Sequence, residues 1–160
     1  MGVISFDDEF SSAVAPHRLF HALFEDAHNL MPKIMPHGVK SVDFVSGEGG
    51  PGSVQQVNFP DGGPVKYVKN RLDSKDKDNL EIKYTVIECD AFGDKIDFIS
   101  NEIKFEAGPD GGCICKSKST YHPKGDAVLN EEEIKAGKER SKGMFKFVEA
   151  YLIENPQLYA

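Results

Sequence analysis

The hydrophobic positions at the start of the chain predict one strand followed by two short helices. Residues 2–11 alternate between hydrophobic and polar side chains, which is typical of a half-buried strand. Pro16 then opens a stretch in which Leu19, Phe20, Leu23 and Phe24 recur at helical spacing, and proline suits the first turn of a helix. The pattern breaks near residues 26–29. A second short helix is therefore predicted over residues 30–34, within a segment that also carries prolines.

From residue 39 the hydrophobic period changes to two, which predicts a run of strands. Turns rich in glycine, proline and aspartate separate them, notably residues 47–52 and the sequence Asp61-Gly62-Gly63-Pro64. The predicted strands cover residues 39–45, 54–57, 65–71, 80–86, 96–105 and 113–121. Together with the first strand they make seven, and the short connections between them favour an antiparallel sheet.

The C-terminal segment carries the clearest helical pattern. Asn130 precedes three glutamates, so it is a good candidate for the residue that caps the helix. Hydrophobic and small residues follow at roughly helical spacing, at Ile134, Ser141, Phe145, Val148 and Leu152. The predicted fold class is therefore α+β, with a highly curved antiparallel sheet wrapped around a long C-terminal helix.

Several residues that such a sheet and helix would turn inward are polar. They are Lys69, Arg71, Asn101, Lys116 and Lys138. A filled core rarely contains so many polar groups without partners, whereas an internal site for an amphipathic small molecule requires some. The pattern therefore predicts an enclosed apolar pocket.

Composition narrows the function classes. The chain has 160 residues and a formal charge of −7, which fits one domain over residues 1–160 and disfavours binding to nucleic acid or anionic lipid. Nothing in it resembles a membrane span or a signal peptide. Cys113 and Cys115 lie two apart in a predicted strand, too far apart for an unstrained disulfide, which favours a reducing, cytosolic location. If Lys116 faces the pocket, both thiols point outward.

A set of ordered motifs resembles a known family. The motifs are Gly47-Glu48-Gly49-Gly50-Pro51-Gly52-Ser53, Lys66-Tyr67-Val68-Lys69, Ser100-Asn101-Glu102-Ile103, Pro109-Asp110-Gly111-Gly112, Tyr121-His122-Pro123-Lys124-Gly125-Asp126 and Glu149-Ala150-Tyr151-Leu152. Together they closely resemble the plant pathogenesis-related class ten proteins, the family of the major birch-pollen allergen. The resemblance runs from the first residue to the C-terminus.

The resemblance implies a hollow helix-grip fold in a monomeric, cytosolic plant protein, often stress-induced, that binds flavonoids, cytokinins, steroid-like molecules or fatty acids. It implies no catalytic residue, metal or cofactor. The ligand-binding residues that it implies are Leu23, His28, Met31, Phe59, Val65, Tyr67, Lys69, Arg71, Ile82, Tyr84, Asn101, Ile103, Lys116, Lys138, Arg140, Ser141 and Met144. Many relatives have aromatic residues at Leu23, Met31 and Ile82, so the aliphatic side chains here would shift ligand preference. His28 often corresponds to an acid.

Two enzymatic alternatives stay open. Some relatives are described as ribonucleases, and the corresponding residues here are Asp97 or Glu102 with Glu149 and Tyr151. The lysines of the glycine-rich loop in those relatives are absent here, which removes positive charge that a phosphate would need. Other relatives condense amines with aldehydes through a buried lysine, for which Lys69, Lys116 or Lys138 with Tyr84 are candidates.

Two further patterns resemble known sites less well. The glycine-rich loop lacks the Gly-Lys-Ser/Thr ending of a phosphate-binding loop and is followed by a predicted strand, so a hairpin turn fits it better. His17, His21 and Glu25 share one helical face at a spacing that can bind a metal, but without a fixed third ligand a solvated helix face is the better account.

Overall fold

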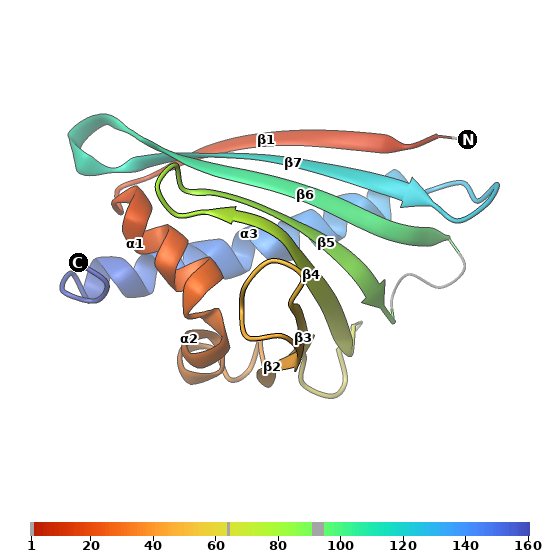
Figure 1. The fold of residues 1–160 in the computed structure, drawn as a ribbon, viewed down its shortest axis with the longest axis horizontal. Helices are drawn as coiled ribbons and strands as arrows, with labels where there is room; N and C mark the ends of the chain where they lie inside the picture. Colours follow the sequence, from red (N-terminus) through yellow and green to blue (C-terminus); the bar gives the residue numbers. More distant parts are fainter. Residues whose placement is uncertain (1, 64, 91–94) are drawn as a thin grey trace.

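Seven strands form one antiparallel sheet in the computed structural model, which describes residues 2–63, 65–90 and 95–160. The strand order across the sheet is β1-β7-β6-β5-β4-β3-β2. The strands are β1 (Ile4–Ser12), β2 (Ser41–Ser46), β3 (Val54–Asn58), β4 (Tyr67–Asp76), β5 (Glu81–Cys89), β6 (Ile96–Ala107) and β7 (Cys113–Pro123). The sheet is strongly curved, and a long helix runs along it (Figure 1). The predicted fold class is confirmed.

Short helices follow β1, as predicted. They are α1 (Pro16–Phe20), a π-helical turn η1 (His21–Glu25) and α2 (Ala27–Ile34). Pro16 occupies the first turn of α1, where it breaks no helical hydrogen bond. Asp26, with φ −119° and ψ 13°, separates η1 from α2 and accounts for the break seen in the sequence. Figure 1 shows these helices together at one end of the sheet.

The long helix α3 (Glu131–Glu154) is anchored at both of its ends. At its start, the Asn130 side chain accepts hydrogen bonds from the backbone N–H groups of the second and third helical residues, as a capping residue should. Near that end, Ile134 packs with Tyr121 and Leu129. Near the other end, Val148 and Leu152 belong to the main hydrophobic core. Between the two ends, the helix faces a cavity.

Arg18 on α1 fastens the far end of α3. Its Nε donates to the carbonyl of Leu158 at 2.9 Å, and its Nη2 donates to the carbonyls of Leu152 and Asn155 at 2.9 and 2.8 Å. The last turn of α3 contains no basic residue of its own. The Arg18 guanidinium therefore supplies the positive charge that favourably meets the negative end of the helix dipole. Figure 1 shows the C-terminus beside α1.

The loops differ from the sequence prediction in two details. β4 continues to Asp76, so the predicted polar turn at 74–79 starts later. Leu80, assigned to the next strand from its hydrophobicity, lies in that turn with φ of 54° and precedes β5. Residues 47–53 form the hairpin connection predicted between β2 and β3, where the Ser53 hydroxyl accepts a hydrogen bond from the Gly49 N–H. Pro64, the last residue of the predicted turn at 61–64, lies outside the described residues.

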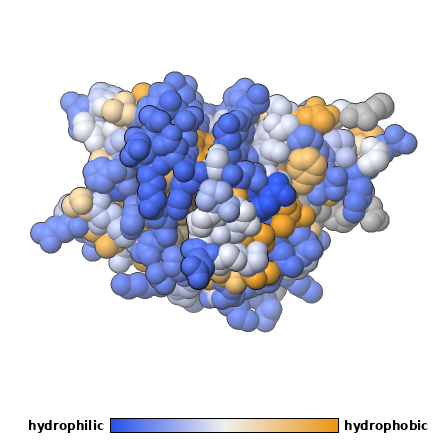
Figure 2. Space-filling view, viewed as in Figure 1, coloured by the Kyte–Doolittle hydropathy of each residue, from blue (hydrophilic) through white to orange (hydrophobic). Residues whose placement is uncertain are grey.

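The face shown in Figure 2 is largely hydrophilic, and its hydrophobic residues form smaller groups. Among the described residues, no helix is long and apolar enough to cross a membrane.

Candidate functional site: an internal cavity

A cavity of about 1610 Å³ lies between the inner face of the sheet, α3 and the short helices. Its volume exceeds the roughly 300–1,000 Å³ of a typical small-molecule site. Most of its wall is apolar, with contributions from Phe24 on η1, Met35 after α2, Leu72 on β4 and Phe145 on α3. Such a space can accommodate a large amphipathic molecule or more than one smaller one.

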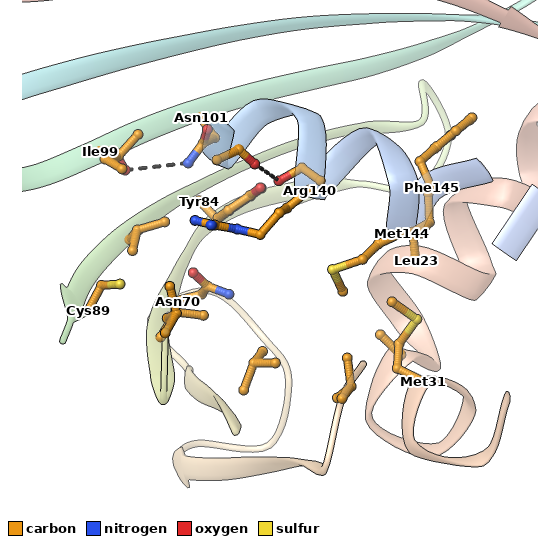
Figure 3. A pocket seen from close by; sticks show the side chains of 18 of the residues that line it. Leu23, Met31, Asn70, Tyr84, Cys89, Ile99, Asn101, Arg140, Met144 and Phe145 are labelled. Carbon is orange, nitrogen blue, oxygen red and sulfur yellow. Dashed lines mark hydrogen bonds between the residues drawn. The ribbon is translucent and has the colours of Figure 1, made fainter. Parts of the chain in front are cut away.

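Thirteen of the residues expected at the ligand site line this cavity. They are Leu23, His28, Met31, Phe59, Val65, Ile82, Tyr84, Asn101, Ile103, Lys138, Arg140, Ser141 and Met144. They come from the short helices, from the loop between β3 and β4, from β5 and β6, and from α3. Figure 3 shows several of them pointing into the same space.

Three expected residues on β4 point to the outer face of the sheet, so the expectation that they line the cavity is wrong. Lys69 pairs with Glu88 through an Nζ–Oε2 distance of 3.2 Å, and Tyr67 is hydrogen-bonded to the same carboxylate. Arg71 donates from Nε to the carboxylate of Asp73 at 2.8 Å. Successive side chains of a strand alternate between its faces, and the inner face of β4 carries the intervening residues.

The same alternation corrects the prediction for β7. Lys116 is exposed on the outer face, where its Nζ lies 3.1 Å from a carboxylate oxygen of Glu106. Cys113 and Cys115 consequently point inward, with 0% and 3% of their surface exposed, and Cys115 lines the cavity. Burial raises the thiol pKa of Cys113 to about 11 and that of Cys115 to about 12. Both thiols are therefore protonated and unreactive at neutral pH.

Sequence reasoning missed several polar residues of the cavity wall. Asn70 lies on the inner face of β4, between Val68 and Leu72, and Asp8 lies on the inner face of β1, between two phenylalanines. In both strands the flanking apolar residues mark the inward face, and this signal was available in the sequence. Ser117, Ser119 and Tyr121 line the cavity from β7.

Two of the inward polar groups are already satisfied by neighbours. The Lys138 ammonium lies 2.7 Å from an Asp8 carboxylate oxygen and 4.8 Å from the centroid of the Phe6 ring. The Ser119 hydroxyl donates to the side-chain oxygen of Asn101 at 2.8 Å. Tyr84 differs, because the described residues include no hydrogen-bond partner for its hydroxyl. Burial raises the pKa of Tyr84 to about 12, so the hydroxyl remains a donor at neutral pH.

Two buried side-chain atoms among the described residues have no hydrogen-bond partner in the protein, and both residues line the cavity. They are His28 Nδ1 and Asn70 Oδ1. Asn29 Nδ2 donates to Asp26 and lies 3.2 Å from His28 Nε2, which must accept, so Nδ1 carries the proton of the neutral ring. An unsatisfied buried polar group costs about 1–3 kcal/mol. The cavity wall thus offers one unmet donor and one unmet acceptor.

Comparison with known proteins identifies the family. The model of the Pathogenesis-related protein Bet v 1 family matches residues 1–155. The chain belongs to this family. The major allergen Pru ar 1 of Prunus armeniaca is 49% identical over 159 residues, which cover 99% of each chain. The crystal structure of Ara h 8.0201 matches with a TM-score of 0.86 and 36% identity, over 96% of this chain and 99% of that one.

A more distant solved structure shows the same fold in an enzyme. It is norcoclaurine synthase from Thalictrum flavum in complex with dopamine and hydroxybenzaldehyde, with a TM-score of 0.67 and 17% identity over 92% of this chain and 87% of that one. At this identity the likeness concerns the fold alone.

The candidate ribonuclease residues of this Bet v 1 family protein do not form one site. Glu102 pairs with Lys83 at 3.2 Å on the outer face of the sheet. Glu149 and Tyr151 belong to α3, which covers the inner face, and Tyr151 packs against the hydrophobic core. Asp97 is exposed at the start of β6. The sheet therefore lies between Glu102 and the two helical candidates.

Of the three residues His17, His21 and Glu25 that share a helical face, Glu25 makes ion pairs with two lysines. Glu25 lies 3.6 Å from His21, but it also lies 2.8 Å from Lys77 and 3.9 Å from Lys75. Across the residues that the structure describes, no group of three or more His, Cys, Asp or Glu side chains could hold a metal ion. The cluster joins η1 to the end of β4 near the edge of the cavity.

Proposed function

We propose that this Bet v 1 family protein binds and carries amphipathic small molecules in its internal cavity, as part of plant defence or stress responses. The observation that carries this proposal is a large apolar cavity whose wall includes two polar atoms that have no hydrogen-bond partner in the part of the chain that the structure describes. Flavonoids, cytokinins, steroid-like molecules and fatty acids all combine an apolar body with a few hydrogen-bonding groups. They are the ligand classes that we consider.

Burial of the ligand's apolar surface would supply most of the affinity, at about 25 cal/mol per Å² removed from water. The polar residues would orient the ligand. Tyr84 and His28 offer donors, whereas Asn70 offers an acceptor and Asn101 is held by Ser119. A molecule that satisfies these groups gains both affinity and a fixed orientation.

The direct test is native mass spectrometry of the protein purified from its own tissue, with chemical identification of any molecule that co-purifies. One retained amphipathic compound at near one-to-one stoichiometry is expected. A protein that is empty and also ignores a panel of flavonoids, hormones and fatty acids would contradict the proposal.

A matched pair of variants locates the binding within the cavity. The protein contains no tryptophan, so a single introduced tryptophan is a specific fluorescent reporter. Ser117→Trp would place it on the cavity wall, and Lys118→Trp would place it on the outer face of the same strand. Ligand addition is expected to change the emission of the first variant and leave the second unchanged. Equal responses would place binding outside the cavity.

Lysine-dependent condensation has weaker support. Of the three candidate lysines, Lys138 lines the cavity, whereas Lys69 and Lys116 form ion pairs on the outer face. A Schiff base on Lys138 would require it to leave its ion pair with Asp8. Borohydride reduction in the presence of an aldehyde is expected to leave Lys138 unmodified. Trapping at that residue, lost in Lys138→Met, would favour the enzyme instead.

A single ligand-binding domain over residues 1–160, a monomeric state and a cytosolic location remain predictions. Size-exclusion chromatography with light scattering tests the oligomeric state, and a fluorescent fusion expressed in plant cells tests the location.

A further inference from the structure

Arg140, an exposed residue of α3, brings a positive charge to the cavity wall. It extends from α3 toward the wall formed by β4 and β5, where Asn70 and Tyr84 also point into the cavity (Figure 3). Among the described residues, no carboxylate oxygen lies within 4 Å of its guanidinium, and it makes no hydrogen bond through its side chain. A guanidinium offers five N–H donors in a planar arrangement that matches a carboxylate or a sulfonate.

Three of the four other lysine and arginine side chains that line the cavity are paired with carboxylates, and the fourth, Lys95, is an exposed residue just before β6. Lys138 lies 2.7 Å and Lys142 lies 3.9 Å from the carboxylate of Asp8. Lys75 lies 3.9 Å from the carboxylate of Glu25. An anionic ligand would have to compete with these carboxylates at either pair, but would meet no such competitor among the described residues at Arg140.

Asn70 and Tyr84 lie next to each other on the inner face of the sheet. In the pairing of β4 with β5, Leu72 lies opposite Tyr84 and Asn70 lies opposite Val86, so Asn70 and Tyr84 are diagonal neighbours. Neither the Asn70 oxygen nor the Tyr84 hydroxyl has a hydrogen-bond partner among the described residues. The hydroxyl can donate to an anion, and the Asn70 oxygen can accept from a ligand O–H or N–H group.

We infer that the cavity selects amphipathic ligands that carry an anionic group, a carboxylate or a sulfonate, which the Arg140 guanidinium binds while the ligand donates a hydrogen bond to Asn70. This inference rests on the proposed carrier function and specifies its ligand class. Arg140 is then the residue that separates acidic from neutral ligands. The apolar wall accepts the body of both.

Two fluorescent probes with the same aromatic body test the inference. The anionic probe 8-anilino-1-naphthalenesulfonate differs from neutral N-phenyl-1-naphthylamine by its sulfonate alone. Affinities of both are measured for the native protein, Arg140→Gln, Arg140→Lys and Asn70→Asp. Lys146→Gln is the control, because it removes the same charge from an exposed position of α3 that does not line the cavity.

Arg140→Gln is expected to weaken binding of the sulfonate about tenfold, the loss of one charge-assisted contact, and to leave the neutral probe within about twofold. Arg140→Lys should retain part of the preference. Asn70→Asp should weaken the sulfonate selectively, because it adds a like charge. The control should bind both probes as the native protein does.

Four results would overturn the inference. Arg140→Gln could lower both affinities equally, which would make Arg140 a packing residue. Lys146→Gln could reproduce the loss, which would make the effect one of overall charge. Finally, the native protein could bind neither probe, which would refute the carrier function itself. A native protein that binds the two probes equally tightly would instead refute the anion preference while leaving the carrier function intact.

Discussion

Replacement of Arg18 by alanine should destabilise the protein by detaching the end of α3 from α1. Three backbone carbonyls, those of Leu152, Asn155 and Leu158, accept hydrogen bonds from this one guanidinium at 2.8–2.9 Å. Two of these bonds are partly shielded from water and the third is exposed. In the variant, the carbonyls would depend on water, and the helix dipole would lose its cation.

The size of the effect follows from the type of bond. A hydrogen bond to a charged group contributes about 1.5–3 kcal/mol, but the three bonds share one donor group and are not additive, so we expect a loss of about 3 kcal/mol for Arg18→Ala. Arg18→Lys keeps the charge near the helix end, worth about 0.3–1 kcal/mol, but a single ammonium cannot reproduce the planar donor arrangement. Its loss should be about 2 kcal/mol.

Urea unfolding followed by circular dichroism measures these losses, and thermal unfolding should show a decrease in Tm of about 6–12 °C for Arg18→Ala in a chain of this size. Lys33→Ala, a change at an exposed residue of α2, is the control and should lie within about 0.5 kcal/mol of the native protein. If Arg18→Ala also lies within that range, the three hydrogen bonds do not hold α3 in place and the reasoning is refuted.

Three other predictions follow from the described contacts. Stability should decrease as the pH falls from 6 to 3. Burial raises the pKa of Glu25, but Lys77, Lys75 and His21 lower it by more, so the pKa lies below its ordinary value of 4.5. The stability that Glu25 provides is present above 4.5 and is lost as the pH falls through its lower folded-state pKa, so Glu25→Gln should flatten the acid limb of urea midpoint against pH. Iodoacetamide at pH 8 should leave Cys113 and Cys115 unmodified until the protein is denatured, and peptide mapping that finds either residue labelled in the native protein would contradict their burial. Gly112→Ala should lower the free energy of unfolding by about 2 kcal/mol or more, because the new Cβ would lie 2.2 Å from a backbone oxygen at the end of β1. Gly50→Ala is the control, because its Cβ would meet open space. Thermal unfolding should show a lower Tm for the first variant and almost no change for the second.

Hydrophobic periodicity was sufficient to predict the elements, but not the inward face of every strand. In β7 the buried residues Cys113, Cys115 and Tyr121 mark the inner face. The sequence-based prediction had instead turned Lys116 inward, as a polar group that could bind a ligand. Both faces of these strands carry polar residues, so polarity alone does not show which face of a strand points into the cavity. The inner one is recognisable by the apolar residues that alternate with its polar ones, as Val68 and Leu72 flank Asn70.

Contacts between distant segments were beyond the reach of sequence patterns. The ion pair of Asp8 with Lys138 joins residues 130 positions apart, and the contact of Arg18 with Leu158 joins residues 140 positions apart. Each depends on how α3 lies across the sheet and the short helices. Lys138 has a carboxylate partner, whereas Arg140 has none among the described residues. This difference can be recognised only from the three-dimensional structure.

The anchoring of α3 at its two ends has a consequence for how this protein can diverge. Ile134 at one end and Val148 and Leu152 at the other hold the helix, whereas Arg140 and Ser141 between them face the cavity and contribute little to the hydrophobic core. In the proposed carrier, mutations in the middle of the helix can therefore alter the preference for ligands with little loss of stability. A duplicated copy of the gene could acquire a new ligand through changes in this short stretch, without first needing compensating mutations elsewhere.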